Sequence, residues 1–309
     1  MSIRDYNFEG LRGRYGHWPA RDSSSKRTIV LLYGQHATIE RVMAIVEALR
    51  EFGDVYIVDN PGFGGMDASY KNGKYPSLSF FASHLKHFID THVAKDRRLT
   101  LFGISFGFQI VTQLLHDYPA ECKRVENVVS FAGFVHPSDF SMSLSYRLPL
   151  IEGVARTSRT KLGGSVYKSL RRESLIVAVY MLTKPIQVKI KNMDRVTARS
   201  YAKEQAALWK TNDARTQGAT AWDFVKKNDL TGYRIKADLA YLGVPNDHIL
   251  NSLQVKSELE HMYNNVSAYD LLLDNHAPLD IETPAKVRAV LPKPFIESMK
   301  KSSNKLAVI

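Results

Sequence analysis

The pentapeptide Gly103-Ile-Ser105-Phe-Gly107 is the part of this chain best suited to chemistry, because of what lies on either side of it. Residues 98–102 have the composition of a short buried strand, and residues 108–115 that of a helix with an apolar face. A strand that enters Gly-x-Ser-x-Gly and leaves it as a helix forms a nucleophile elbow. The turn is so tight that glycine is expected on both sides, and it lifts the serine hydroxyl to the positive end of a helix.

The elements that would position this serine alternate between strands and helices. Apolar runs of strand length are followed by helical patterns, and this alternation predicts an α/β fold with a mostly parallel sheet and helices on both faces. The expected strands are 27–33, 54–58, 98–102, 125–132, 237–242 and 268–273, and the expected helices are 39–52, 78–93, 108–115, 250–262 and 284–291. The tail at 300–305 is polar and is expected to fray.

A helical segment interrupts this alternation. Helical patterns cover 163–181, 188–209 and 221–229, and residues 136–234 hold 18 Lys and Arg against 8 Asp and Glu. Most of the net charge of +11 therefore belongs to this segment. The sequence predicts a core domain made of residues 1–135 and 236–309, with residues 136–235 inserted as a helical, strongly basic domain.

Four motifs in this order resemble the α/β-hydrolase superfamily, in its esterase-like serine hydrolases with a helical cap inserted after the sixth strand. They are Tyr33-Gly34-Gln35, Asp59-x-Pro61-Gly62-x-Gly64, the elbow around Ser105, and the stretch from Asn275-His276 to Glu282-Thr-Pro284. The resemblance covers most of residues 27–135 and 236–295. It implies that the segment 136–235 is a cap domain.

The resemblance also implies roles for individual residues. A serine hydroxyl needs a base to take its proton, and the base needs an acid to orient it. Ser105 would be the nucleophile, His276 the general acid and base, and Asp247 the orienting acid, in the family's chain order. Asp139, after the expected strand 125–132, is an alternative acid. The backbone N–H groups of Gln35 and Phe106 would form the oxyanion hole, and Gly103 and Gly107 would shape the elbow.

The predicted activity is cleavage of a carboxylic ester, or a related acyl bond, through an acyl-enzyme without metal or organic cofactor. The same residues leave open an acyltransferase, a lactonase, an aminopeptidase or a carbon–carbon hydrolase. A receptor or scaffold that uses the pocket only to bind is the alternative outside the enzyme class. His36 is interpreted as a pocket wall, and His84, His87 and His92 as surface residues of one helix.

Composition places the chain among ordinary globular proteins, with 44% hydrophobic and 24% charged residues. The sequence contains no apolar run near the length of a membrane-spanning helix, and the first residues do not resemble a signal peptide. Its one cysteine, Cys122, is interpreted as an incidental thiol and is compatible with a reducing compartment. These features predict a cytoplasmic protein whose oligomeric state the sequence does not indicate.

The basic segment allows three interpretations. Its charge could attract an anionic small-molecule acyl substrate, or it could dock the protein on an anionic membrane. The apolar run 175–182, flanked by Arg171, Arg172, Lys184, Lys189 and Lys191, could then be an interfacial helix. In the third interpretation, which we favour at this stage, the lysines are only solvated and the apolar run packs over the pocket. The few lysines near its tryptophans do not indicate nucleic acid binding.

Overall fold

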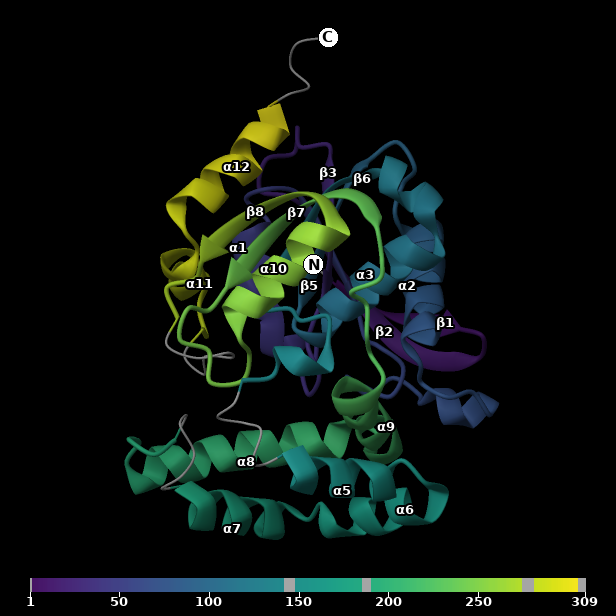
Figure 1. Cartoon of the computed structure of the whole chain (residues 1–309), viewed down its shortest axis with the longest axis vertical. Helices are drawn as coiled ribbons and strands as arrows, with labels where there is room; N and C mark the ends of the chain where they lie inside the picture. The colour runs from purple at the N-terminus through teal and green to yellow at the C-terminus, as the bar shows by residue number, and fades with distance from the viewer. Residues whose placement is uncertain (1, 142–147, 185–189, 274–280, 305–309) are drawn as a thin grey trace.

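The computed structural model describes residues 2–141, 148–184, 190–273 and 281–304 (Figure 1). In these residues eight strands form one sheet in the order β1-β2-β4-β3-β5-β6-β7-β8. Strands β3 to β8 pair in parallel, and the hairpin β1–β2 joins β4 in antiparallel fashion. The predicted α/β class is confirmed. The strands are β1 (Ser2–Phe8), β2 (Leu11–Trp18), β3 (Arg27–Leu32), β4 (Asp54–Val58), β5 (Arg98–Ile104), β6 (Val125–Phe131), β7 (Ile235–Gly243) and β8 (Tyr263–Asp270).

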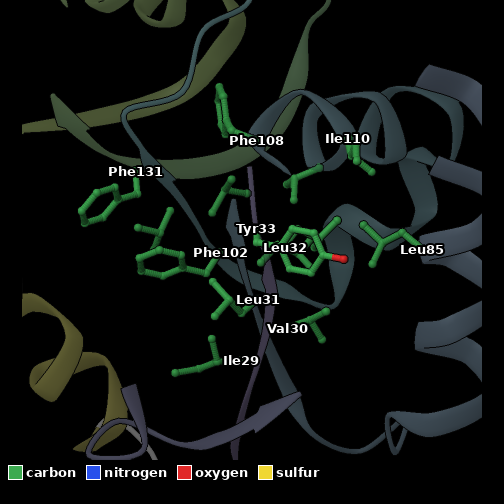
Figure 2. Close-up of a cluster of buried hydrophobic side chains, with 14 of the residues drawn as sticks. Ile29, Val30, Leu31, Leu32, Tyr33, Leu85, Phe102, Phe108, Ile110 and Phe131 are labelled. Carbon is green, nitrogen blue, oxygen red and sulfur yellow. The ribbon is translucent and has the colours of Figure 1, made fainter. Parts of the chain in front are cut away.

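The apolar core runs through the central strands β3 and β5. All six residues of β3 are buried, as a parallel strand covered on both faces requires. Figure 2 shows residues 29–32 packed among Phe102 of β5, Phe131 of β6, and Phe108 and Ile110 of the helix that follows β5. Burying a side chain of this size stabilises the fold by about 1.5–3 kcal/mol. Apolar packing therefore fixes where β5 ends and where Ser105 lies.

Helices cover both faces of the sheet (Figure 1). The helix α2 (Leu78–His92) packs on α3 (Phe106–Asp117), and α1 (Met43–Leu49) packs on α11 (Pro284–Val290) on the opposite side. No helix in the described ranges is long and apolar enough to cross a membrane. The other helices around the sheet are α10 (Ser252–Met262), α12 (Lys293–Asn304) and the 3-10 turns η1 (Glu40–Val42), η2 (Ser69–Asn72), η3 (Pro119–Lys123) and η4 (Pro137–Asp139).

Between β6 and β7 the described residues form a helical layer. Its members are α5 (Leu148–Ser158), α6 (Lys161–Leu170), α7 (Glu173–Thr183), α8 (Arg195–Thr211) and α9 (Ala214–Lys226). Figure 1 shows this layer beyond one end of the sheet, with α6 and α7 farthest from the strands. Helix α5 was not predicted from the sequence. The expectation of one helical region over 163–181 was wrong, because α6 and α7 are separate helices.

The break between α6 and α7 follows from the burial of Arg171. This residue is 7% exposed, and its guanidinium donates to the carbonyl of Trp209, to that of Asn212 at 2.9 Å, and to Gln217 Oε1 at 2.8 Å. A buried guanidinium needs such acceptors, so the chain leaves the helix at this residue. Arg171 therefore joins α8 and α9, whereas its neighbour Arg172 is exposed.

Three elements differ from the sequence-based expectation. The turn at Glu9 and Gly10, with φ of 51° and 81°, closes a hairpin of β1 and β2 that was not predicted. Strand β8 ends at Asp270 instead of spanning 268–273, because it is an edge strand with mostly exposed residues and not an apolar run. Residues 300–304 continue α12 instead of fraying, because Phe295 and Met299 bury one face of this helix.

The expectation that His84 lies on the surface was wrong. Its side chain is fully buried on α2, with its ring edge-on to Tyr6 at 5.5 Å and to Phe8 at 5.2 Å between centroids. Within the described ranges neither of its ring nitrogens has a hydrogen-bond partner. Burial lowers the pKa of His84 to about 3. The neighbouring His87 is exposed, as expected.

We expect His84 to make the fold sensitive to acid. Its pKa is near 6.5 in the unfolded chain and about 3 in the folded one, so its contribution to stability is lost as pH falls below 6.5. Between pH 7.5 and 5.5 this residue should reduce the free energy of unfolding by about 1.4 kcal/mol. Urea unfolding at both pH values, of wild type, His84→Leu and the exposed control His87→Leu, measures this change in the free energy of unfolding. An unchanged pH dependence in His84→Leu would contradict this assignment.

Candidate active site

Ser105 occupies the turn between β5 and α3. Its backbone has φ 49° and ψ −114°, a conformation that residues other than glycine rarely adopt. The Ser105 N–H donates to the carbonyl of Phe131 on the neighbouring strand β6 at 3.0 Å. The sheet on one side and α3 on the other thus stabilise this strained backbone conformation, as the elbow pattern predicts.

Gly103 and Gly107 are required by close backbone approaches. A Cβ on Gly103 would lie 2.4 Å from the Cα of Phe108, and one on Gly107 would lie 2.4 Å from the carbonyl oxygen of Leu32. The first contact is within the elbow, as expected. The second is with β3, so Gly107 also lets α3 approach the neighbouring strand.

The loop after β3 lies against the elbow. A Cβ on Gly34 would lie 3.3 Å from the Cβ of Ser105. Gln35 follows in this loop, and its side-chain Nε2 donates to Thr220 Oγ1 at 2.7 Å. Phe106 is the first residue of α3, so its N–H has no acceptor within the helix. The two backbone segments proposed for an oxyanion hole therefore flank Ser105.

The motif residues Tyr33 and Asp59 hold the two loops together. The Tyr33 hydroxyl donates to Asp59 Oδ1 at 2.8 Å and accepts the N–H of Asn60 at 3.2 Å. Arg14 Nε donates to Asp59 Oδ2 at 3.0 Å, while burial raises the pKa of this carboxyl to about 7. Tyr33 thus serves to fix the loop that carries Gln35.

We expect Gly64→Ala to destabilise the fold far more than Gly65→Ala. Gly64 has φ 61°, and a Cβ there would lie 1.9 Å from Asp59 Oδ1 and 2.6 Å from the Tyr33 hydroxyl. Gly65 has φ 91°, but a Cβ there meets no atom within 4 Å. The positive φ alone costs an alanine about 1–2 kcal/mol at either position. Only Gly64→Ala should lose more stability than this, because only its Cβ meets other atoms. Urea unfolding of both variants tests the difference, and equal losses would contradict it.

Asp247 lies in the loop after β7, as the sequence analysis expects. Its Oδ1 accepts the N–H of Ile249 at 2.8 Å, and its own N–H donates to the carbonyl of Val244 at 3.2 Å. The side chain is half-buried. Because Ile249 lines the cavity described below, this turn holds the carboxylate close to the cavity wall.

Asp139, the alternative acid, is fully buried and takes part in a backbone turn. Its Oδ2 accepts the N–H groups of Val135 at 2.8 Å and His136 at 2.9 Å. Its carbonyl accepts the N–H of Asn251 at 2.7 Å, which ties this loop to the one that carries Asp247. Burial raises the pKa of the Asp139 carboxyl above its usual range. These contacts indicate a structural task.

His276, the predicted base, belongs to the stretch 274–280, which lies outside the described residues. The structure therefore places Ser105, Gln35, Phe106 and Asp247 but not the histidine. The residues that follow this stretch, Ile281 and Glu282, line the same cavity as Ser105.

Ser105 opens onto a cavity of about 610 Å³ between the sheet and the helical layer. This volume is in the range of small-molecule sites. Its polar lining includes Gln35, His36, Glu40, Arg41, Tyr201 and Gln205. Much of the remaining wall is apolar, with Phe131, Phe134, Phe140, Phe224, Ile249 and Leu250 among the lining residues.

His36 lies in the cavity wall, as predicted. Its Nδ1 lies 2.7 Å from Gln217 Nε2, and its ring packs on Trp209 with centroids 4.4 Å apart. Burial, with a smaller contribution from the charge of Arg171, lowers the pKa of His36 to about 4. The imidazole is therefore neutral at pH 7 and accepts the amide proton.

A network that the sequence does not predict joins the helical layer to the loop after β3. Gln217 contacts His36, accepts from Arg171 through Oε1, and offers its backbone carbonyl to the Gln35 amide at 3.3 Å. Helix α9 thus positions the Gln35 loop. No local pattern marks these residues, because the contacts join positions about 180 residues apart.

Cys122 stays apart from this site. It is half-buried beside η3 and is not among the described residues that line the cavity. Burial raises the pKa of its thiol, which is the opposite of what a nucleophilic thiolate needs.

Comparison with known proteins identifies the family. A family model described as serine aminopeptidase, S33, matches residues 23–245, which is most of the chain and includes Tyr33, Asp59 and Ser105. The chain belongs to this family of α/β hydrolases. The match ends two residues before Asp247 and does not reach His276.

Solved structures share the fold at low sequence identity. An enol-lactonase from Burkholderia xenovorans LB400 is 16% identical over 97% of this chain and 99% of its own, with a TM-score of 0.66. The esterase RhEst1 from Rhodococcus sp. ECU1013 is 15% identical over 97% of this chain and 100% of its own, with a TM-score of 0.65. At sequence identities this low, the two structures show that this S33-family chain shares their fold, and they show nothing more about it.

A curated relative matches part of the chain. It is a poly(3-hydroxyalkanoate) depolymerase from Ectopseudomonas oleovorans, 27% identical over 107 residues. The match covers 35% of this chain and 36% of that protein, so the chain spans about a third of its relative's length.

Proposed function

We propose that this S33-family protein is a serine hydrolase that cleaves carboxylic esters through an acyl-enzyme. Ser105 is the nucleophile, His276 the general acid and base, and Asp247 the acid that orients His276. The observation that carries the proposal is the position of Ser105, on a strained elbow that opens onto a largely apolar cavity beside the Gln35 loop. The esterase, the lactonase and the depolymerase named above act on ester bonds, which supports the choice of substrate.

The first half of the reaction acylates Ser105. His276 takes the hydroxyl proton as Oγ attacks the acyl carbon, and the carbonyl oxygen becomes an oxyanion. The N–H groups of Phe106 and Gln35 stabilise that charge, each worth about a hundred- to a thousandfold in turnover. The tetrahedral intermediate then breaks its bond to the alcohol, which leaves with the proton from His276. Water repeats these steps on the acyl-enzyme and releases the acid.

Asp247 acts through His276. Its carboxylate fixes the imidazole tautomer and stabilises the imidazolium that forms at each proton transfer. The hydrogen bond from the Ile249 N–H to Oδ1 holds the carboxylate in one orientation. Asp139 is less suited to this role, because it is fully buried and burial raises the pKa of its carboxyl, whereas the orienting acid must stay ionised.

The helical layer, within residues 136–235, is proposed to act as a cap that selects the acyl group. Its helices α8 and α9 supply Tyr201, Gln205, Leu208 and Phe224 to the cavity wall, and Phe140 adds to it from the segment before α5. Apolar and aromatic walls favour an acyl chain or an aryl group over a small charged substrate.

A second candidate activity is cleavage of an aminoacyl group. The family model carries the name serine aminopeptidase, and the carboxylates of Glu40 and Glu282 line the cavity, where a substrate ammonium could bind. Arg14 already pairs with Glu40 at 2.7 Å, which weakens this candidate.

A panel of p-nitrophenyl esters and aminoacyl p-nitroanilides tests the proposal. We expect turnover of the esters, with kcat/KM rising from acetyl to hexanoyl as the chain fills the apolar wall, and slower turnover of the anilides. Preference for the anilides would favour the aminopeptidase. Tight binding of an ester without hydrolysis would favour a receptor and overturn the proposal.

A further inference from the structure

Helix α6 exposes a stripe of apolar side chains. Leu162, Val166 and Leu170 recur at every fourth position, so they lie along one side of the helix, and they are 79%, 53% and 54% exposed. The buried Gly164 packs on the other side, against the backbone of Ser158. The apolar stripe of α6 therefore faces away from the rest of the helical layer.

Helix α7 is apolar on nearly every side. Glu173 carries the one charge in its eleven residues, and Val177 is buried against the protein. Leu175, Val179 and Leu182 lie on the other side and are 43%, 49% and 81% exposed. A helix that is apolar all round is normally buried, so this exposed side is of the kind that a partner covers.

Basic residues accompany these two stripes. Lys161, Lys168 and Arg172 are exposed, and within the described ranges none of their side chains takes part in an ion pair. Glu173, the residue after Arg172, pairs with Lys210 at 3.5 Å. This region is thus both apolar and positive, and we call the six exposed apolar residues of α6 and α7 with these three cations the α6–α7 face.

The cavity does not account for these features. The residues that the segment 136–234 supplies to the described lining are Phe140, Tyr201, Gln205, Leu208 and Phe224, and none of them is basic. No residue of the run 175–182 is among the described lining either. The sequence-based interpretation that this run packs over the pocket was wrong.

We propose that the α6–α7 face docks on an anionic lipid bilayer. Its leucines and valines would enter the boundary between headgroups and acyl chains, and its lysines and Arg172 would bind the headgroup phosphates. These two helices form the outermost part of the helical layer, where a flat surface can reach them (Figure 1). A second copy of this chain is a poorer occupant, because two such faces would repel each other.

Vesicle flotation of the full-length protein tests the docking. The vesicles contain phosphatidylcholine alone or with 30% phosphatidylglycerol, at low and high salt. We expect binding to the anionic vesicles at low salt, weaker binding at high salt, and little binding to neutral vesicles. Absence of binding to anionic vesicles at low salt, or equal binding to both compositions, would overturn the proposal.

Matched variants test whether this face is responsible. Leu162→Gln with Leu182→Gln should weaken binding at least tenfold, while Leu253→Gln with Leu272→Gln, at exposed leucines elsewhere (82% and 70%), should not. Equal loss in both pairs would overturn the proposal. A dimer in solution that only the first pair dissociates would assign the face to a second copy instead.

Charge variants complete the test. Lys161→Gln, Lys168→Gln and Arg172→Gln together should lower the partition coefficient about a hundredfold, at about fivefold per cation. The exposed lysines Lys123, Lys236 and Lys286, changed in the same way, serve as the control. Arg171 is kept, because it is buried and joins α8 to α9. An equal effect of both triple variants would contradict a role for this face.

Discussion

Ser105→Ala should lower kcat on the best ester by about a millionfold, because without Oγ there is no nucleophile for the base to activate. The fold should be retained. Alanine keeps the Cβ that already fits the strained φ of 49°, and the backbone hydrogen bond to Phe131 needs no side chain. The measurement is kcat together with the unfolding temperature, with Ser83→Ala on helix α2, outside the described cavity lining, as the control.

Two results would contradict the role of Ser105. One is Ser105→Ala activity within tenfold of wild type, which would require a nucleophile elsewhere on the chain. The other is an equal loss of kcat in Ser83→Ala, which would trace the effect to general damage and not to the elbow.

Asp247→Asn should lower kcat about ten-thousandfold with little change in KM, because an amide favours the wrong imidazole tautomer and cannot stabilise the imidazolium. The amide oxygen can still accept the Ile249 N–H, so the loop should keep its shape. The matched variant is Asp139→Asn, whose side chain holds the turn of Val135 and His136. It should retain kcat within tenfold and lose about 1–2 kcal/mol of stability.

The opposite pattern of losses would change the assignment of the orienting acid. Near-normal turnover in Asp247→Asn, with a loss of several thousandfold in Asp139→Asn, would assign the orienting role to Asp139. Combining Asp247→Asn with Ser105→Ala should add no further loss, since both act on one proton transfer.

The sequence predicts well what local signals determine. β3 is a continuous apolar run because it is buried on both faces, and the elbow is recognisable because Gly103 and Gly107 are forced by contacts within a few residues or with the adjacent strand. The hairpin β1–β2 also had such a signal, the Glu9-Gly10 turn between alternating apolar residues, which the sequence analysis did not use.

Other features depend on contacts between distant parts of the chain. The break at Arg171 exists because its acceptors lie on α8 and α9, and no periodicity reveals them. His84 is a polar residue and was expected on the surface, but Tyr6 and Phe8 of the unpredicted hairpin bury it. Helix α7 was read as buried because it is apolar, whereas the structure leaves one of its sides exposed. Tertiary packing overrides the local pattern in each case.

Labelling with a fluorophosphonate probe tests the central claim most directly. The probe reacts with serines that are activated by a base and an oxyanion hole, so it reports the assembled site without knowledge of the substrate. We predict one label per wild-type chain, located on Ser105 by peptide mass spectrometry, absent from Ser105→Ala and slowed by the best ester. A folded wild-type protein that stays unlabelled, or a label that persists in Ser105→Ala, would contradict the account.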